Sequence, residues 1–342
     1  MYSSVLITGG TGTFGTSYIC KAIENRWHSK IIVYSRDEFK QVRLSKYIQS
    51  KYSNRVISSR DFAIALDTCE IRFFIGDVQD FERLKIAMKD VDLVVHSAAL
   101  KHVPVCEYNP EQAINTNITG SINVAKAAAL SGVKKVVGLS TDKAADPINL
   151  YGASKLCLEK ILLGYYNYFD TTTYHIVRYG NVIGSRGSII PMISDPENFN
   201  LKITDPEMTR FWISIEDAIA LTRYAIREGT CSEIFVPKMK SLSMEKVFEY
   251  LRPDTVPEHI GRRPGEKQHE TMISENDMHR TFDLGECYGI QSDLHSSRIF
   301  DNKKPVSFDV YTSDTVDRFT KEEFLKKVQN TMVVNLNNEL LK

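Results

Sequence analysis

The stretch Val5-Leu6-Ile7-Thr8-Gly9-Gly10-Thr11-Gly12-Thr13-Phe14-Gly15 decides the fold of this chain. Its first four residues form a short apolar run of the kind that makes a buried parallel strand. Gly9, Gly12 and Gly15 then follow at a spacing that lets the backbone approach a pyrophosphate, and a helix to about Asn25 would point its N-terminus at the charge. The stretch predicts a dinucleotide-binding turn, although the same glycines could form a turn without a cofactor.

Apolar runs and helical segments continue to alternate beyond this turn. We expect strands at 30–34, 71–78, 93–96, 136–139 and 174–178, and helices at 80–88, 109–129 and 156–166. Residues 41–70 are polar and weakly periodic, which indicates one or two surface helices and a loop near 58–61. Beyond residue 180 the elements become shorter, at 211–213, 215–227, 233–236 and 244–251.

This rhythm predicts an α/β fold with a Rossmann-type doubly wound parallel sheet and a smaller C-terminal substrate-binding lobe. We expect residues 1–180 to form the NADP-binding domain. Residues 181–342 would form mainly the substrate-binding lobe, interleaved with that domain.

Composition narrows the class of protein. The 342 residues contain 43 Lys plus Arg and 43 Asp plus Glu, so charge gives no argument for nucleic acid or for an anionic membrane. The six cysteines are scattered without metal-type spacing, which indicates reduced thiols and no metal site. No signal peptide and no membrane-spanning run are visible, so we expect a cytoplasmic protein.

The end of the second expected strand decides between two cofactors. An acidic residue there selects NAD, whereas a nearby arginine accommodates the 2′-phosphate of NADP. Both Arg36 and Asp37 follow Ser35, which leaves the position ambiguous. Arg36 comes first and Lys40 lies one helical turn further, so the interpretation favours NADP, with a solvated charged loop as the alternative.

Two later strand ends add candidates for the same cofactor. Asp77, next to Val78, could bond the adenine amine or cap the following helix. The small residues Ala98 and Ala99 would let the backbone lie against the cofactor, with Lys101 within reach of the nicotinamide ribose or the substrate.

Two polar residue types near these strand ends need separate interpretations. We interpret His96 as a core histidine whose hydrogen bonds are satisfied, rather than as a catalyst. Asn115 and Asn117 lie within the expected helix at 109–129, where asparagine costs stability, so at least one should hydrogen-bond a neighbouring loop.

The stretch Ser140 to Lys155 carries the candidate chemistry. Tyr151 and Lys155 lie four residues apart and share a face if a helix begins there. Asp142 and Lys143 follow an apolar run and would lie at the carboxyl end of its strand, where open α/β sheets bind ligands. Asp142 as a helix cap and Lys143 as a solvated side chain are the structural alternatives.

Arginines recur in the C-terminal half of the chain. Arg210 lies in Met208–Trp212, and Arg262, Arg263 and Lys267 lie in the block from Gly261 to Lys267. Arginine forks suit a diphosphate, but ordinary surface arginines are equally consistent with the sequence.

The glycine spacing and Tyr151-x-x-x-Lys155 resemble the extended short-chain dehydrogenase/reductase superfamily. Several further blocks are similar to its inverting UDP-N-acetylglucosamine 4,6-dehydratases, which also epimerise C5. These blocks are 34–38, 98–104, 140–155, 178–182, 208–213 and 263–267. Related membrane-bound retaining dehydratases have methionine where Tyr151 stands and carry transmembrane helices, and this chain has neither feature.

The resemblance implies which residues bind each ligand. It places the cofactor on Gly9, Thr11, Gly12, Thr13, Phe14, Gly15, Ser35, Arg36, Lys40, Asp77, Val78, Ala98, Ala99, Lys101, Tyr151 and Lys155. It places UDP-N-acetylglucosamine on Lys101, Asn181, Arg186, Thr204, Arg210, Arg263 and Glu266. It also implies a homo-oligomer, either a dimer or a hexamer.

The same resemblance implies the mechanism. Tyr151 takes the proton of the 4-hydroxyl, Thr141 hydrogen-bonds that hydroxyl, and Lys155 lowers the phenol pKa by placing a cation beside it. The cofactor oxidises C4 and later reduces C6, so NADP+ is recycled. Lys143 removes the C5 proton, and protonated Asp142 helps the 6-hydroxyl leave. The product is the L-arabino 4-keto-6-deoxy sugar nucleotide, used for surface glycans.

Two other functions remain open from the sequence. A UDP-sugar 4-epimerase shares the fold and the first step, but it has no use for a base at C5. A non-catalytic NADP-binding regulatory protein would be expected to have lost Tyr151 or Lys155, and this chain retains both.

Overall fold

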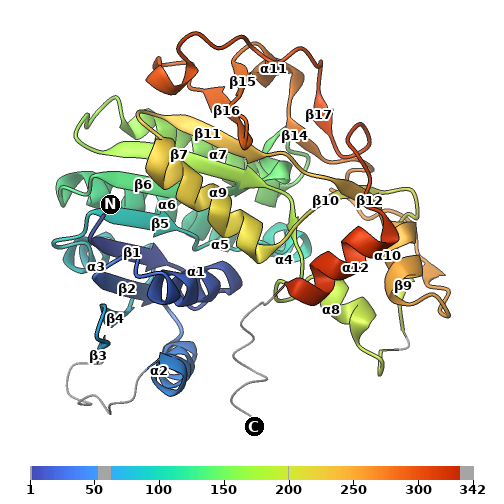
Figure 1. Ribbon diagram of the computed structural model, residues 1–342, viewed down its shortest axis with the longest axis horizontal. Helices are drawn as coiled ribbons and strands as arrows, with labels where there is room; N and C mark the ends of the chain where they lie inside the picture. The colour runs from blue at the N-terminus through green and yellow to red at the C-terminus, as the bar shows by residue number, and fades with distance from the viewer. Residues whose placement is uncertain (1, 53–62, 199, 332–342) are drawn as a thin grey trace.

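A computed structural model of the chain describes residues 2–52, 63–198 and 200–331. Within these residues a ten-stranded sheet has the order β15-β16-β11-β7-β6-β5-β1-β2-β4-β3 (Figure 1). The strands from β11 to β4 in this order are parallel: β11 (Glu233–Pro237), β7 (Thr173–Tyr179), β6 (Lys135–Thr141), β5 (Leu93–His96), β1 (Ser4–Thr8), β2 (Lys30–Ser35) and β4 (Glu70–Ile75). The antiparallel edges are β16 (Cys287–Gln291), β15 (Thr281–Asp283) and β3 (Ala63–Ala65). The predicted doubly wound sheet is confirmed.

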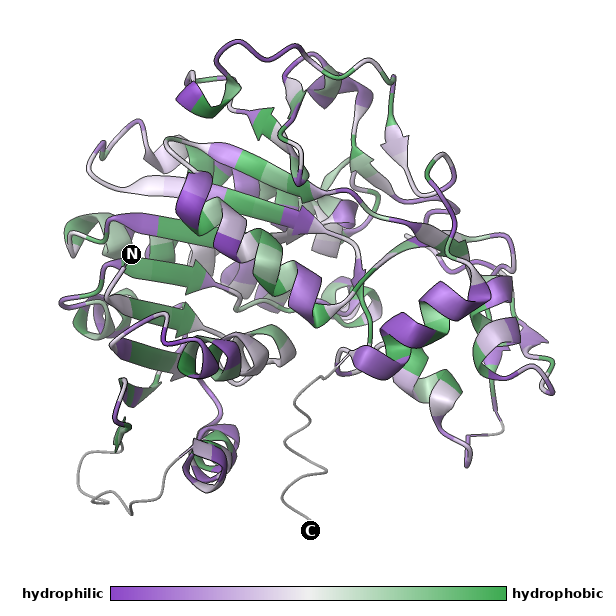
Figure 2. Cartoon of the chain, in the orientation of Figure 1, coloured by the Kyte–Doolittle hydropathy of each residue, from purple (hydrophilic) through white to green (hydrophobic). Residues whose placement is uncertain are grey.

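Helices cover both faces of this sheet, which explains why its central strands are buried and mainly apolar. On one face, α1 (Thr13–Glu24) packs against α9 (Ile215–Glu228), and α2 (Glu38–Tyr52) lies against β2. On the other face, α6 (Gly120–Leu130) packs between α3 (Phe81–Ala87) and α7 (Leu150–Tyr165). Every residue of β1, β5 and β6 is buried, and these strands form the apolar centre of Figure 2.

The strand order reverses beside β1. The chain passes from β1 to β2 on one side, whereas β5 pairs with β1 on the other side. In open α/β sheets such a reversal opens a crevice at the carboxyl ends of the strands. The loops after β1, β2, β5 and β6 therefore converge on one edge.

The predicted helix at 109–129 is interrupted. The chain forms α4 (Val103–Tyr108), which the sequence did not predict, then α5 (Pro110–Ile114), a π-helical turn (Asn115–Thr119) and α6. The Asn117 carboxamide accepts a hydrogen bond from Leu100 N at 2.8 Å and donates to Leu100 O at 2.9 Å. The wide turn aims this side chain at the loop after β5, which confirms the expected contact between an asparagine and a loop.

Residues 41–70 contain the rest of α2, the short strand β3 and the start of β4. The expected strand at 71–78 already ends at Ile75. The loop expected near 58–61 lies outside the described residues.

The residues after 180 build a smaller lobe and also complete the main sheet. The lobe contains β8 (Asn181–Val182), β10 (Thr209–Ile213) and β12 (Ser241–Ser243) in one sheet, and the pairs β9 (Lys202–Ile203) with β13 (Glu258–His259) and β14 (Thr271–Ile273) with β17 (Tyr311–Thr312). Its helices are α8 (Ile189–Ser194), α10 (Met244–Leu251), α11 (Glu275–Met278) and α12 (Lys321–Asn330).

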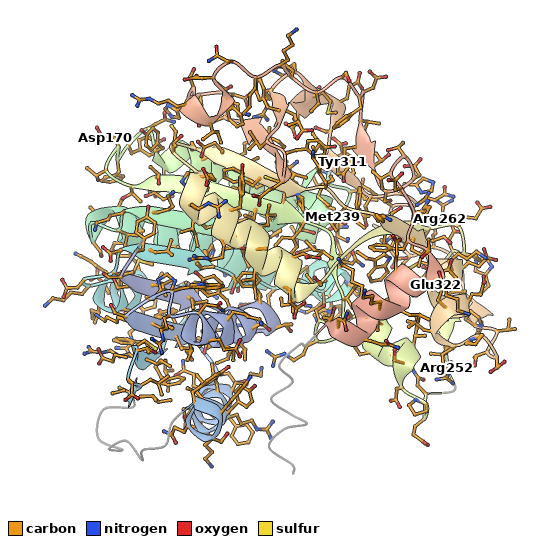
Figure 3. All side chains as sticks on the ribbon, viewed as in Figure 1. Asp170, Met239, Arg252, Arg262, Tyr311 and Glu322 are labelled. Atoms are coloured by element: carbon orange, nitrogen blue, oxygen red, sulfur yellow. The ribbon has the colours of Figure 1, made fainter. Side chains whose placement is uncertain are left out.

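Trp212, Phe248 and Phe324 belong to a second apolar cluster inside the lobe. The main-chain N–H of Met239, just after β11, donates to the hydroxyl of Tyr311 at 2.6 Å, so β17 is fastened to the sheet (Figure 3). β11, β15 and β16 belong to the main sheet and α9 packs on it, although all four follow residue 180, so the proposed division at residue 180 stays a prediction.

None of the helices in the described ranges is long and apolar enough to cross a bilayer. All six cysteines lie in these ranges, where none forms a disulfide, and only Cys157 is exposed.

Candidate active site

The loop after β1 has the shape of a phosphate cradle. Gly9 has φ +66°, and a Cβ there would lie 2.9 Å from Ala98 N. At Gly15 a Cβ would lie 2.6 Å from the Cα of Gly10, so only glycine lets the start of α1 pack this closely on the loop. Glycine at these positions leaves room for a pyrophosphate beside the first turn of α1.

A cleft of about 250 Å³ extends from this cradle along the strand ends. It is lined by Gly9, Thr11, Gly12, Tyr34, Ser35, Arg36, Asp37, Lys40, Gly76, Asp77, Val78, Ser97, Ala98, Ala99, Thr116 and Arg186. Ten of the predicted cofactor residues are in this group. Thr13, Phe14 and Gly15 lie in the first turn of α1 instead.

The charged residues at the end of β2 are partly engaged with each other. The Arg36 guanidinium lies 3.4 Å from Asp77 Oδ2 and is 55% exposed at the side chain. Asp37 pairs with Lys40 at 3.0 Å and accepts the Lys40 main-chain N–H. Hydrogen bonds from Lys40 hold the pKa of Asp37 below its usual value. Arg36 is therefore more available to a ligand than the Asp37 carboxylate is.

Two alternative roles considered for residues along the cleft are resolved. Asp80, not Asp77, caps α3 by accepting Arg83 N at 2.9 Å, so the helix-cap alternative for Asp77 was wrong. His96 is fully buried and hydrogen-bonds Thr8 and Ser121, and burial lowers its pKa to about 3. It is a core histidine, as expected.

Arg186 bridges the cleft from the loop after β8. Its guanidinium donates to the Thr11 carbonyl, and its main-chain N–H donates to Thr13 Oγ1 at 3.3 Å. Lys101 Nζ donates to the Arg186 carbonyl at 3.0 Å. Arg186 was assigned to the substrate, but the structure places it against the phosphate cradle, and Lys101 lies beside it.

The three polar residues at the end of β6 form one buried cluster. Thr141 donates to Asp142 Oδ1 at 2.9 Å, and Lys143 Nζ lies 3.1 Å from the same oxygen. Asp142 is fully buried, and its Oδ2 has no hydrogen-bond partner among the described residues. Burial raises the pKa of Asp142, with Lys143 opposing the shift. The structural alternatives fail here, because Thr141 caps the short turn at Asp142–Ala144 and Lys143 is held by carboxylates.

Tyr151 enters the same cluster from the first turn of α7, and Lys155 follows it one helical turn later. Asn149 caps this helix by accepting Gly152 N at 2.8 Å. A Cβ at Gly152 would lie 2.2 Å from the Lys143 carbonyl, so glycine allows α7 to begin directly against the Lys143 turn. α7 begins at Leu150, before the expected helix at 156–166, so the condition that puts Tyr151 and Lys155 on one helix is met and Tyr151 lies next to Lys143.

The electrostatics of Tyr151 differ from the expectation. Burial raises its pKa to about 12, while the Lys143 charge and a hydrogen bond with Thr141 lower it partly. A lowering by Lys155, as expected, is not among the effects on the Tyr151 pKa. Lys155 is itself 4% exposed, and burial lowers its own pKa to about 8. The cation that acts on the phenol in this structure is Lys143.

Sequence reasoning missed Glu270, which lies just before β14. Its Oε1 is 3.1 Å from Lys143 Nζ and 3.7 Å from Arg210 Nε, and the residue is 2% exposed. The only signal in the sequence was its position shortly after the block that ends at Lys267. Lys267 Nζ itself donates to the Ala145 carbonyl at 2.8 Å, which ties this block to the catalytic turn.

The remaining predicted substrate residues are spread over the lobe. Arg210 is buried beside Glu270, and Asn181 lies in β8, which pairs with β10. Thr204 contacts Met208 Sδ at 3.4 Å, and the Arg263 main-chain N–H donates to Glu266 Oε2 at 3.3 Å. Of these residues, only Arg210 has an interaction with the catalytic cluster.

The site can therefore combine redox and proton-transfer chemistry. A dinucleotide cradle follows β1, and a phenol, an ammonium group and two carboxylates gather at the end of the nearby strand β6, with Lys155 one helical turn beyond the phenol. No three potential metal ligands cluster anywhere in the part of the chain that the structure describes.

Comparison with known proteins gives the family. The family model described as "Polysaccharide biosynthesis protein" matches residues 5–292. A UDP-N-acetylglucosamine 4,6-dehydratase (inverting) of Campylobacter jejuni strain 81-176 is 44% identical over 296 residues, which are 85% of this chain and 83% of that protein. A UDP-glucose 4-epimerase of Rickettsia bellii strain OSU 85-389 is 39% identical over 96% of this chain and 95% of its own length.

Solved structures agree on the fold. The X-ray structure of Pen from Bacillus thuringiensis has a TM-score of 0.85 and 34% identity, covering 97% of this chain and 98% of that one. DesIV, a dTDP-glucose 4,6-dehydratase of Streptomyces venezuelae, has a TM-score of 0.66 at 20% identity over 78% of this chain and 86% of its own. With its residues 5–292 matched by the family model, this chain belongs to the polysaccharide biosynthesis protein family of the extended short-chain dehydrogenase/reductase type.

Proposed function

We propose that this chain is an inverting 4,6-dehydratase of UDP-N-acetylglucosamine. Its product would be UDP-2-acetamido-2,6-dideoxy-L-arabino-hexos-4-ulose, a precursor for surface glycans. The observation that carries the proposal is the buried Asp142–Lys143 pair, 3.1 Å apart, beside Tyr151. The Campylobacter jejuni relative with the same printed activity supports it.

The glycine cradle and the cleft beside it fit a nicotinamide dinucleotide. Gly9, Gly12 and the first turn of α1 would hold the pyrophosphate, and the residues after β2 would hold the adenosine ribose. When bound, the nicotinamide supplies the redox chemistry by oxidising C4 of the sugar and later reducing C6. We favour NADP over NAD because Arg36, whose contact with Asp77 is 3.4 Å, is held less closely than Asp37, which Lys40 binds at 3.0 Å through both its side chain and its main-chain N–H.

Tyr151 would take the proton from the 4-hydroxyl as C4 becomes a ketone. Its phenol has a raised pKa of about 12, so nearby cations must stabilise the phenolate that the step requires. Lys143 supplies one such charge in the structure, and Lys155 lies one helical turn away on α7. Thr141 would hold the hydroxyl in line.

Lys143 and Asp142 would then remove water. With C4 a ketone, the C5–H bond lies α to a carbonyl, and the neutral Lys143 amine can take its proton. Asp142 has a raised pKa and would protonate the departing 6-hydroxyl. A proton transfer from the Lys143 ammonium to the Asp142 carboxylate prepares both groups at once, and after elimination each has its original charge again.

A UDP-sugar 4-epimerase is the second candidate, favoured by the Rickettsia bellii relative, which matches nearly the whole chain. Epimerisation at C4 needs no base at C5 and leaves the buried Asp142–Lys143 pair without a task.

Proton NMR of purified protein incubated with UDP-N-acetylglucosamine separates the candidates. A new C6 methyl doublet means dehydration, a galacto isomer means epimerisation, and no change favours a non-catalytic NADP-binding protein. We also propose that the protein is cytoplasmic and forms a homo-oligomer, either a dimer or a hexamer. Sedimentation of the purified protein tests its assembly state.

A further inference from the structure

Glu270 belongs to the catalytic cluster although it comes from the C-terminal lobe. Its main-chain N–H donates to Ser313 Oγ at 2.9 Å, and its carbonyl accepts Ser313 N at 2.8 Å. The strand that follows it, β14, packs against the turn at Asp142–Ala144. The backbone of Glu270 is thus fixed on both sides, and its side chain is directed to Lys143.

Lys143 lies between two carboxylates. Its Nζ is 3.1 Å from Asp142 Oδ1 and 3.1 Å from Glu270 Oε1. The other carboxylate oxygens, Asp142 Oδ2 and Glu270 Oε2, are buried and have no partner among the described residues. A buried carboxylate oxygen without a partner is unfavourable unless it is protonated or bound by a ligand. This arrangement therefore has room for one mobile proton and for hydroxyl groups of a substrate.

We propose that Glu270 is a positioning residue of the elimination step. Its carboxylate fixes the Lys143 amine opposite Asp142 and stabilises the ammonium that forms when Lys143 takes the C5 proton. This inference rests on the proposed dehydratase function, and it assigns to Glu270 a task that a 4-epimerase does not need.

The elimination step balances its protons with Lys143 and Asp142 alone and needs no further acid or base. The Lys143 ammonium first gives a proton to Asp142, which leaves a neutral amine and a carboxylic acid. The amine takes the C5 proton, the C5–H electron pair forms the C5–C6 double bond, and the C6–O bond breaks. The oxygen leaves as water with the proton of Asp142. Glu270 stays ionised throughout and faces Lys143 when that residue is positively charged.

Charged groups on the elements packed around Lys143 affect how readily Lys143 and Asp142 hold their protons. The groups that face Lys143 are Asp142, Glu270, Arg210, Lys267 and Tyr151. Asp142 and Glu270 raise the pKa of Lys143 despite its burial, and Arg210 opposes them. Glu270 also contributes to the raised pKa of Asp142, and Lys143 and Arg210 keep the pKa of Glu270 itself low.

The Glu270→Gln variant tests the charge, because the amide has nearly the same shape. Removing the negative charge lowers the proton affinity of both Lys143 and Asp142. The pair titrates with two macroscopic pKa values, so both limbs of the pH profile for C5–H exchange in D₂O should move to lower pH. The Glu270→Ala variant also removes one of the two anchors of Lys143, and its exchange rate should fall by about tenfold or more at the optimum.

Asp277→Asn is the matched control. Asp277 is a buried carboxylate of the same lobe. It pairs with Arg178 at 3.3 Å and not with Lys143. This change should lower the stability of the lobe, because Asp277 pairs with Arg178 and Arg280, but it should leave both limbs of the pH profile in place. A Glu270→Gln profile that keeps the wild-type limbs, or moves them to higher pH, would overturn the proposal.

A measurement without substrate keeps the inference separate from the proposed function. In protein labelled with ¹³C at lysine Cε, the Lys143 signal is identified by its loss in Lys143→Ala. Its pKa should fall by about 1–3 units in Glu270→Gln, the usual effect of losing an opposite charge at this distance. An unchanged titration refutes the coupling even if wild type is active. Wild type that makes no 4-keto-6-deoxy sugar refutes the dehydratase function while this titration still decides the role of Glu270.

Discussion

Arg178 and Glu159 form a two-pronged ion pair in the core, with Nε 3.0 Å from Oε1 and Nη2 2.6 Å from Oε2. Ser140 donates to the same Oε1 at 2.6 Å, so the pair fastens α7 to both β6 and β7. Glu159 also lies one helical turn beyond Lys155. Burial lowers the pKa of Lys155, and the Glu159 carboxylate raises it. The frame of the candidate site is therefore held by a buried charge pair.

Removing one member of this pair should be severe. Glu159→Ala leaves the Arg178 guanidinium buried without its main partner, and the free energy of unfolding should fall by about 3–5 kcal/mol. Urea denaturation followed by circular dichroism measures this loss. Lys160→Ala, on the same helix and 62% exposed at the side chain, should change the stability by less than about 1 kcal/mol. Equal effects of the two substitutions would contradict the assignment.

Lys143→Ala should separate binding from chemistry. The variant lacks the base for C5, so formation of the C6 methyl group should slow by roughly 10²–10⁴-fold. Binding of UDP-N-acetylglucosamine, measured by calorimetry, should stay within a few-fold of wild type. The Lys160→Ala protein serves again as the control, and full turnover by Lys143→Ala would exclude the proposed base.

Lys155→Met should change how stability depends on pH. The folded-state pKa of Lys155 is about 8, below its ordinary 10.5, so between these values the unfolded chain binds more protons. The Lys155 contribution to stability therefore rises with pH through this window and is unfavourable below it. Lys135 has the same lowered pKa of about 8 and contributes a slope of the same sign, whereas the raised pKa of Cys287 contributes one of the opposite sign. Urea denaturation from pH 7 to 10.5 should show stability rising less with pH in Lys155→Met than in wild type, together with higher stability at pH 7. A slope equal to that of wild type would mean that Lys155 is not buried as an ammonium.

Arg36→Ala should change the choice of cofactor. A hydrogen bond to a charged group is typically worth about 1.5–3 kcal/mol, so NADP affinity should fall by about ten- to a hundredfold while NAD affinity changes little. Calorimetry with each dinucleotide measures the ratio. Asp37→Asn is the companion variant, and it should weaken neither NADP binding nor the fold. Equal loss of both cofactors in Arg36→Ala would favour a purely structural arginine.

The fold was largely predictable from local patterns. The apolar runs at β1, β5 and β6 are buried on both faces, and such strands have a signature that depends little on distant residues. A helix through Tyr151 and Lys155 was indicated for a similar reason, because the spacing of these two residues matters only on a helix.

What could not be predicted depends on contacts between distant parts of the chain. The π-helical turn contains Asn117, which hydrogen-bonds Leu100 in a distant loop. A single wide turn hardly changes the apolar periodicity of a helix, so the sequence pattern does not reveal it. The high pKa of Tyr151 results from burial, which a sequence motif does not report. Glu270 has no motif around it that indicates a partner, and it meets Lys143 only because β14 packs on the catalytic turn.

The bonds between Glu270 and Ser313 also have a consequence for biosynthesis. A chain is made from its N-terminus, and N-terminal units tend to fold first. The glycine cradle is therefore available early, whereas Glu270 is locked in place only after Ser313 has left the ribosome. The proton-transfer site is therefore completed late in synthesis, and termination before residue 313 would remove the two Ser313 bonds that hold the Glu270 backbone.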